Sequence, residues 1–490
     1  MKYFSTRGGE TVSAATAIMR GICPKGGLYV PEAFPQVDLE TLSPLAADYP
    51  ALAAELMLPY FSELGETRMR ELTGLAYASF DVPEVVPVVP LGSEESVMEL
   101  WHGPTMAFKD VALQMLPYLM RESLRLNSED KQVYILVATS GDTGKAALEG
   151  FANVPGTRIL VYYPAGGVSE VQRLQMVTQE GDNVDVCGVE GNFDDAQTGV
   201  KRIFTNHEMA KDLAERGYRL SSANSINFGR LLPQIVYYFS SYLRLVTAGT
   251  IACGDKINFC VPTGNFGDIL AGYYAKRMGL PVARFLCASN RNNVLTDFMK
   301  TGRYDANRPF YKSMSCSIDI LISSNLERLL FELGGRDADA TESLMHALKE
   351  KGKYEVTGDM LAELQELFVG DWCDETATHR TIANVFAAQH YLLDPHTAVA
   401  QTIYERYLAE TGDQTHTVVL STANPYKFST DVLQAFEPCG EDDFANAVRL
   451  HDVSGAAIPP QLLALQGKPQ RHEDVVKINE LEKRTAAPLS

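Results

Sequence analysis

Five short apolar runs, each next to a stretch with helical spacing, are the feature that most restricts the fold of this chain. They lie at residues 133–138, 159–163, 257–261, 282–287 and 417–420. Runs that are apolar along their whole length predict strands buried on both faces, as in parallel sheets covered by helices. We therefore expect an α/β fold with parallel sheets, in which ligands bind beyond the carboxyl ends of the strands.

A chain of 490 residues is longer than one hydrophobic core usually extends, so more than one structural unit is expected. Residues 1–90 are rich in Ala, Leu and Glu and predict a mainly helical first domain. The prolines at 82–90 mark its boundary and an edge strand. We expect residues 91–440 to form a core of two α/β lobes, with the smaller lobe at roughly 125–240, and residues 441–490 to form a surface segment.

The net charge of -19 argues against a nucleic-acid or anionic membrane partner, because phosphate-rich surfaces bind basic proteins. No apolar run approaches the roughly 18 residues that span a bilayer. The amino terminus lacks an apolar signal segment, so a cytoplasmic location is expected. The cysteines are scattered without the spacing of zinc ligands; we expect free thiols and no metal site.

Lys109 lies where the helical spacing predicts a core-facing position. The residues three, four, seven and eleven positions after it are apolar: Ala112, Leu113, Leu116 and Met120. The spacing predicts a helix that begins just before the lysine, with Thr105 as its N-cap. Burial disfavours the charged form of an amine, which makes it a nucleophile suited to forming a Schiff base with an aldehyde. A lysine that extends to Asp110 or to solvent is the alternative.

Two loops after predicted strands carry glycines and hydroxyls at the start of a helix. The first, at 139–145, departs from an ATP-binding loop because Ala146 stands where Ser or Thr is needed. Its N–H and hydroxyl groups can hold a carboxylate, and an ordinary capped turn is the alternative. The second, at 262–268, has two glycines around Asn265 that permit a left-handed backbone. It predicts a cradle for a monophosphate, with a plain turn as the alternative.

A third loop, at residues 421–425, places hydroxyls at the carboxyl end of a strand. The hydroxyl of Thr422 can bond a heterocyclic nitrogen, and a plain turn before Pro425 is the alternative. We interpret His102 and His396 as structural, because no second histidine or carboxylate has the spacing of a metal site.

Taken in order, these segments resemble the threonine synthases of the bacterial and fungal type, a branch of the fold-type II pyridoxal-phosphate enzymes. The resemblance covers most of the chain and implies a fold like that of the tryptophan synthase β subunit. It rests on residues 5–8, 26–31, 102–105, 107–110, 140–144, 224–227 with Arg230, 264–268, 395–398 and 421–423.

The resemblance implies pyridoxal 5'-phosphate as cofactor and a reaction that converts O-phospho-L-homoserine and water into L-threonine and phosphate. Lys109 is then implied to hold the cofactor aldehyde and, once freed, to act as the general base. The implied cofactor ligands besides Lys109 are Gly264, Asn265, Phe266, Gly267 and Asp268 for the phosphate and Thr422 for the pyridine nitrogen. The implied ligands of the substrate carboxylate are Ser140, Gly141, Asp142 and Thr143.

For the substrate phosphate, charge points to Arg230 with Asn227, because arginine is suited to bidentate phosphate recognition. A surface arginine at the start of the following helix is the alternative. The alternative function is a related phospho-lyase or β-replacement enzyme that acts on another phosphorylated or hydroxylated amino acid. A non-catalytic relative is expected to lack Lys109 or the glycine loop, and both are present. Monomer and homodimer both stay open.

Overall fold

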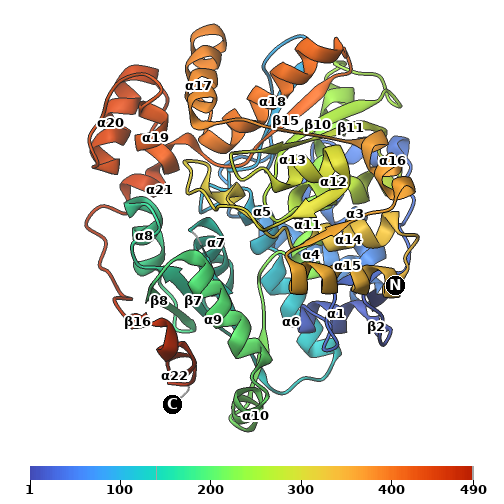
Figure 1. Ribbon diagram of the computed structural model, residues 1–490. Coiled ribbons are helices and arrows are strands. Elements are labelled where there is room, and N and C mark those ends of the chain that lie inside the picture. The colour runs from blue at the N-terminus through green and yellow to red at the C-terminus, as the bar shows by residue number, and fades with distance from the viewer. Residues whose placement is uncertain (140, 488–490) are drawn as a thin grey trace.

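The predicted α/β fold with two parallel sheets is confirmed by the computed structural model, which describes residues 1–139 and 141–487 (Figure 1). The larger sheet has six strands, and all its pairings are parallel except the antiparallel one between its last two strands. In spatial order the strands are β14 (Phe368–Trp372), β11 (Val282–Ser289), β10 (Ile257–Pro262), β15 (Thr417–Ser421), β5 (Glu95–Glu99) and β4 (Val88–Pro90).

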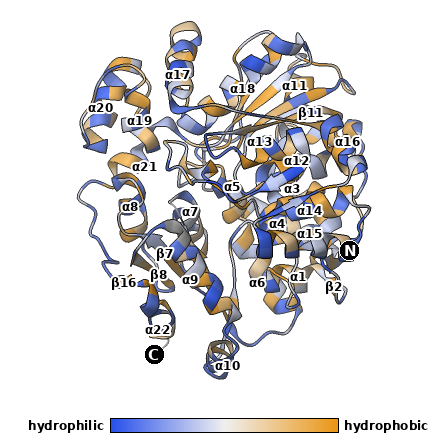
Figure 2. Cartoon of the chain, in the orientation of Figure 1, coloured by the Kyte–Doolittle hydropathy of each residue, from blue (hydrophilic) through white to orange (hydrophobic). Residues whose placement is uncertain are grey.

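Successive residues along the central strands of this sheet face different cores. On β10, Phe259 and Val261 belong to one hydrophobic cluster and Cys260 to another. The sheet and the helices that pack around it are called the large lobe here. These helices carry hydrophilic as well as hydrophobic residues (Figure 2). They are α11 (Phe228–Thr247), α12 (Gly267–Arg277), α13 (Val294–Thr301), α14 (Leu326–Leu333), α15 (Ala338–Lys351), α16 (Gly358–Leu367), α17 (Glu375–Gln389), α18 (Pro395–Thr411) and α19 (Ser429–Leu433).

The second sheet is entirely parallel and forms, with its helices, the small lobe. Its strands in spatial order are β16 (Val475–Lys477), β8 (Val184–Glu190), β7 (Thr157–Pro164), β6 (Gln132–Ala138) and β9 (Tyr218–Ser221). Its helices are α7 (Asp142–Phe151), α8 (Glu170–Val177), α9 (Phe193–Thr205) and α10 (His207–Glu215). Along β6, alternate residues again belong to different clusters, so this sheet is also buried on both faces.

The first part of the chain is mainly helical, as the sequence predicts. A small antiparallel sheet of β1 (Lys2–Ser5), β2 (Val12–Ser13) and β3 (Tyr29–Pro31) accompanies the helices. The helices and 3-10 turns are α1 (Ala14–Arg20), α2 (Leu39–Leu42), η1 (Ser43–Leu45), α3 (Tyr49–Met57), η2 (Leu58–Leu64) and α4 (Glu66–Tyr77). Within the described residues, no helix is long and apolar enough to cross a membrane.

The last part of the chain runs from the large lobe to the small lobe. It contains α20 (Asp443–Ser454), α21 (Pro460–Leu463), β16, η5 (Ile478–Glu480) and α22 (Leu481–Ala486). β16 pairs in parallel with β8, and Leu481 is buried in the small-lobe core. This segment therefore crosses the surface and also completes the edge of a sheet, which its polar composition did not predict.

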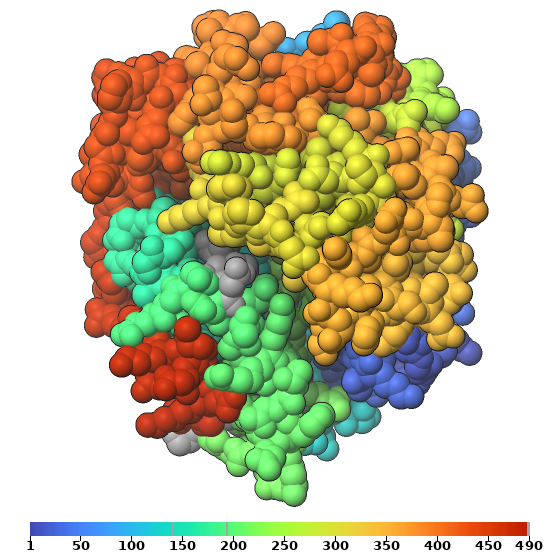
Figure 3. Space-filling model, viewed as in Figure 1, coloured from blue at the N-terminus to red at the C-terminus, as the bar shows by residue number. Residues whose placement is uncertain are grey.

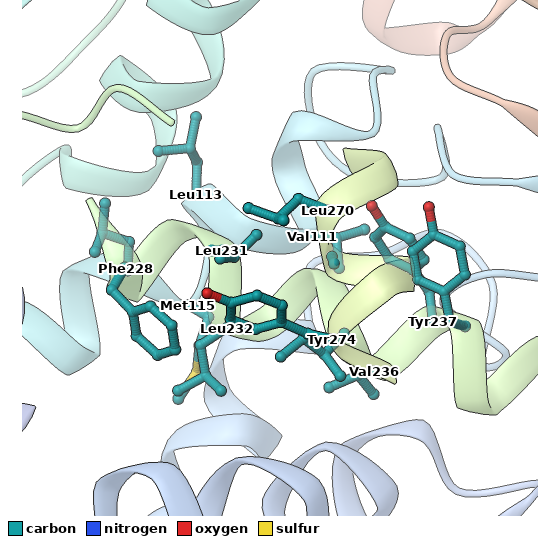
Figure 4. Close-up of a cluster of buried hydrophobic side chains, with 14 of the residues drawn as sticks. Val111, Leu113, Met115, Phe228, Leu231, Leu232, Val236, Tyr237, Leu270 and Tyr274 are labelled. Atoms are coloured by element: carbon teal, nitrogen blue, oxygen red, sulfur yellow. The ribbon is translucent and has the colours of Figure 1, made fainter. Parts of the chain in front are cut away.

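Two short helices join the lobes beside the larger core: α5 (Lys109–Leu113) and α6 (Leu116–Leu126). The predicted N-cap is wrong, because α5 begins at Lys109 after Phe108, and the Thr105 backbone N–H and hydroxyl both donate to Asp110. Figure 4 shows Val111 and Leu113 of α5 packed among apolar side chains of α11 and α12. This packing fixes the helix turn that carries Lys109.

The close approach of α7 to α5 depends on Gly150. A Cβ at this position would lie 2.0 Å from the carbonyl oxygen of Leu113. We expect Gly150→Ala to push the two helices apart and to lower the free energy of unfolding by about 1–3 kcal/mol, the usual cost of overpacking. Gly74→Ala in α4 is the matched control, because a Cβ there meets no atom within 4 Å. Alanine at position 74 should be neutral or stabilise by up to about 1 kcal/mol in urea unfolding. Equal stability of the two variants would contradict this role of Gly150.

Candidate active site

A cavity of about 250 Å³ opens between the two lobes at the carboxyl ends of their strands. The segment around residues 300–325, in yellow, lies against the green small lobe on the face that Figure 3 shows. Most of the site residues expected from the sequence line this cavity: Lys109, Asp142, Thr143, Arg230, Gly264, Asn265, Phe266, Gly267, Asp268 and Thr422. Gly141 and Asn227, although described, are not part of its lining, and Ser140 lies outside the described residues.

Lys109 is buried at the cavity wall, with 9% of its side chain exposed. Its ammonium donates to Ser317 Oγ at 3.2 Å and lies 3.6 Å from Asp142 Oδ2. Burial lowers the pKa of this amine, Asp142 opposes the effect, and Arg230 and Lys427 reinforce it. The alternative, a lysine that extends to Asp110 or to solvent, is therefore not what the structure shows, because the Lys109 side chain lines the cleft.

Asp142, in the first turn of α7, is the carboxylate that faces Lys109. Its Oδ1 lies 2.9 Å from the ammonium of Lys427, and its Oδ2 accepts a hydrogen bond from Ser317 at 3.3 Å. Burial opposes ionisation, but Lys427 and Lys109 hold the pKa of the Asp142 carboxyl well below its usual value. Lys427 is fully buried, and we did not predict it as part of the site. Its place between Tyr426 and Phe428, in a segment after a strand, was the available signal.

The turn before α7 requires glycine at position 141. Gly141 has φ of 141°, and a Cβ there would lie 2.4 Å from the Gln172 side chain. Its N–H donates to Thr139 Oγ1, and the Gly144 N–H donates to the same hydroxyl. The first N–H groups of a helix have no acceptor within the helix, and with Gly144 and Lys145 already bonded, the N–H groups of Asp142 and Thr143 are those that α7 offers to an anion at the cavity.

The loop between β10 and α12 is turned by a residue other than the one expected. We expected a left-handed backbone at Gly264 or Gly267; instead Phe266 adopts it, with φ of 61°. Gly264 is required for a different reason, because a Cβ there would lie 2.7 Å from the carbonyl oxygen of Ser317. The loop still leads directly into the N-terminus of α12.

Asp268 lies in the first turn of α12 and joins this loop to α11. Its Oδ1 accepts hydrogen bonds from the hydroxyls of Tyr237, at 2.5 Å, and Tyr238, at 3.0 Å. Its Oδ2 is buried without a hydrogen-bond partner among the described residues. Burial raises the pKa of Asp268 to about 6, although the two tyrosines lower it.

Arg230, in the first turn of α11, is a cavity residue rather than a surface arginine, being 5% exposed. Its Nη1 donates to the carbonyl oxygen of Ala223 at 3.0 Å. Burial lowers its pKa to about 10, so the guanidinium is still charged at neutral pH.

Asn227 is not placed to bind a ligand, which corrects the expectation from the sequence. Its Nδ2 donates to the carbonyl oxygens of Ile18 and Ser222, and its Oδ1 accepts from the Gly229 N–H as the N-cap of α11. Its neighbours Asn224 and Ser225 line the cavity instead. The Oδ1 of Asn224 is buried without a partner among the described residues.

Of the two histidines interpreted as structural, His396 lines the cavity and His102 does not. His102 bonds Asp81 and Glu99 away from the cavity lining. His396 lines the cavity, and its Nε2 accepts the Ser317 N–H at 3.0 Å. Its Nδ1 therefore carries the proton and donates to Asp394, at 2.8 Å. His396 thus fixes the segment whose Ser317 contacts Lys109.

Thr422 completes the lining from the end of β15. Its carbonyl oxygen accepts the Phe108 N–H at 2.8 Å, which ties the turn before Lys109 to this strand. The neighbouring Ser421 hydroxyl accepts from Trp101 Nε1 at 3.0 Å. The end of β15 therefore lies directly beside the lysine.

Family models match almost the whole chain. The model described as "Pyridoxal-phosphate dependent enzyme" matches residues 91–423. Those described as "Threonine synthase N terminus" and "Threonine synthase, C-terminal" match residues 2–77 and 397–486.

Individual proteins agree with these models. "Threonine synthase" of Pseudomonas aeruginosa is 41% identical over 441 residues, which are 89% of this chain and 90% of that protein. "Threonine synthase-like 1" of Homo sapiens is 39% identical over 434 residues, 86% of this chain but only 58% of that longer protein. This chain thus spans less than two thirds of that human relative.

Solved structures give the same result. The crystal structure of "PLP bound Threonine synthase" from Brucella melitensis has a TM-score of 0.88 and 37% identity, covering 99% of this chain and 98% of that one. Threonine synthase from yeast has a TM-score of 0.88 and 33% identity, with the same coverage. The chain therefore belongs to the threonine synthases, a family of pyridoxal-phosphate-dependent enzymes.

Proposed function

We propose that this protein converts O-phospho-L-homoserine and water into L-threonine and phosphate. The observation that carries the proposal is one cavity with both a buried primary amine, Lys109, and a buried guanidinium, Arg230. The amine suits a carbonyl cofactor, and the guanidinium suits a dianionic leaving group. Membership of the threonine synthase family supports the same reaction.

The cofactor ligands proposed from the sequence fit pyridoxal phosphate. Lys109 would hold its carbonyl carbon, residues 264–268 would hold its phosphate at the N-terminus of α12, and Thr422 would face its ring nitrogen. The left-handed turn at Phe266, which leads directly into the N-terminus of α12, supports an anion beside this loop. When bound, the cofactor supplies an electron sink for the carbon chain of an amino acid.

The N-terminus of α7 is the proposed site of the substrate carboxylate. The N–H groups of Asp142 and Thr143 and the Thr143 hydroxyl would bind it, with Gly141 providing the turn and Ser140 proposed from the sequence alone. The side chain of Asp142 takes no part, because it is an anion already held by Lys427 and Gln172. This separates the backbone role of Asp142 from its side-chain role.

Arg230 is the proposed partner of the substrate phosphate, together with Asn224 and Ser225. All three line the cavity, and they flank the start of α11. In a chain with net charge -19, a dianionic substrate needs a fixed cation in the cleft. Asn224 and Ser225 replace Asn227 in this assignment, since the Asn227 amide is used by the backbone.

Lys109 is the proposed base for proton removal at the substrate carbons. Its side chain is only 9% exposed, and burial favours the neutral amine that accepts a proton. Ser317, hydrogen-bonded to both Lys109 and Asp142, orients the amine.

The cytoplasmic location expected from the sequence stays a prediction, and monomer and homodimer both stay open.

Product analysis tests the proposed reaction. We expect the holoenzyme, incubated with O-phospho-L-homoserine, to release L-threonine and phosphate in equal amounts, measured by amino-acid analysis and a phosphate assay. Phosphate release with 2-oxobutanoate as the main product would contradict the proposal and favour a phospho-lyase.

Replacement of Gly264 tests the phosphate cradle. Gly264→Ala places a Cβ against Ser317 and displaces the segment that contacts Lys109. We expect the affinity for pyridoxal phosphate to fall by about 1–3 kcal/mol, roughly 5- to 150-fold in Kd by equilibrium dialysis. Gly267→Ala is the control, because its Cβ would meet atoms no closer than 3.5 Å. If both variants lost the same affinity for pyridoxal phosphate, the close approach of Gly264 to Ser317 would not be the cause of the loss.

Replacement of Arg230 tests the substrate phosphate site. Arg230→Ala should lose about 2–5 kcal/mol of transition-state stabilisation, a fall in kcat/KM for O-phosphohomoserine of roughly 30-fold or more. Cofactor content should stay near that of the wild type. Arg244→Ala is the control on the same helix, where the guanidinium bonds the Glu84 carbonyl outside the cavity lining. Near-normal turnover in Arg230→Ala would place the phosphate elsewhere.

A further inference from the structure

Lys427 is a charged side chain with 0% exposure that lies outside the cavity lining. It belongs to η4 (Pro425–Phe428), which follows β15. Its ammonium donates to the Thr105 carbonyl oxygen at 2.7 Å and lies 2.9 Å from Asp142 Oδ1. A buried lysine is retained only where a carboxylate and hydrogen bonds compensate it, so Asp142 is its counter-ion.

The carboxylate of Asp142 is divided between two cations. Its Oδ1 faces Lys427 and also accepts from Gln172 Nε2 at 3.1 Å. Its Oδ2 faces Ser317 at 3.3 Å and Lys109 at 3.6 Å. One negative charge is thus shared by two ammonium groups. Its attraction to Lys427 is the stronger, because Lys427 lies nearer, at 2.9 Å against 3.6 Å for Lys109.

We propose that Lys427 is a positioning residue for the reaction proposed above: by holding the Asp142 carboxylate, it keeps that anion from fixing Lys109 as an ammonium. This inference rests on the proposed function. Lys109 then releases its proton to solvent through the cavity and becomes the neutral amine, while Asp142 stays ionised against Lys427. Lys427 also ties Thr105, before α5, to α7 of the small lobe, which fixes the distance between Asp142 and Lys109.

The other charged or titratable groups around Lys109 do not replace this effect. Arg230 from α11 is a second cation that disfavours a charged Lys109. Asp268 from α12 is held by two tyrosines, and His396 from α18 is held by Asp394 and the Ser317 N–H. Cys316, from the segment before α14, lines the same cavity. Among these groups, Asp142 is the carboxylate in ion-pair contact with Lys109.

The test measures how fast the protein amine condenses with added pyridoxal phosphate as pH is varied. Full-length protein freed of cofactor is mixed with pyridoxal phosphate, and the visible band is followed by stopped-flow absorbance. We expect Lys427→Met to shift the half-maximal rate upward by about one pH unit or more, a roughly tenfold slower reaction at neutral pH. Lys427→Arg should restore most of the wild-type profile.

Lys145→Met is the matched control. Lys145, on α7, is a lysine with 13% of its side chain exposed, and its ammonium lies 2.7 Å from Glu149, so its loss also leaves a carboxylate unpaired. It lies outside the cavity lining, and its profile should match the wild type. A merely structural role of Lys427 would instead make Lys427→Met and Lys145→Met alike.

Asp142→Asn and the double variant Asp142→Asn/Lys427→Met keep the inference testable if Lys427→Met fails to fold. Removal of the carboxylate should move the profile to lower pH, and in the double variant the upward shift should vanish. The inference would be overturned if a folded Lys427→Met had the pH profile of the wild type. It would also be overturned if the double variant showed an upward shift relative to Asp142→Asn alone. If the variants showed the expected pH shifts but the wild-type holoenzyme formed no threonine, the proposed function would be overturned and the role of Lys427 would stand.

Discussion

The contact between the buried ammonium of Lys109 and the carboxylate of Asp142 is the interaction on which the rest of the site depends. It joins α5, packed against the large-lobe core, to α7 of the small lobe. A charge in such a place is stable only with compensating partners, and a reactive amine needs those partners to be weak. Ser317 and Lys427 satisfy both requirements, because each takes part of the bonding capacity of Asp142.

The two sheets explain why these groups meet. In each lobe the loops after parallel strands gather at one edge, and the edges face each other across the cleft. The small lobe contributes the N-terminus of α7, and the large lobe contributes the loop before α12, the start of α11 and the end of β15. The site is therefore assembled from helix N-termini, which favour anions, around a single amine.

The sequence predicted what local pattern determines and missed what long-range contacts determine. Apolar runs located the central strands, and the position of Lys109 in its helical stripe indicated a buried amine. Lys427 was missed because its counter-ion is far away in the sequence. The left-handed residue was expected to be a glycine but is Phe266, since tertiary packing compensates the cost of that conformation. Asn227 was assigned to the substrate phosphate together with Arg230, whereas the backbone at the start of α11 uses its amide.

The central claim, that Lys109 is the amine that bears the cofactor, is tested most directly by fixing the cofactor to the holoenzyme with borohydride and locating it by peptide mass spectrometry. The account predicts a reduced adduct on the peptide that contains Lys109, with no label on Lys145 or Lys427, whose ammonium groups are held by carboxylates. An adduct on Lys427, or label spread over exposed lysines with Lys109 unmodified, would contradict it.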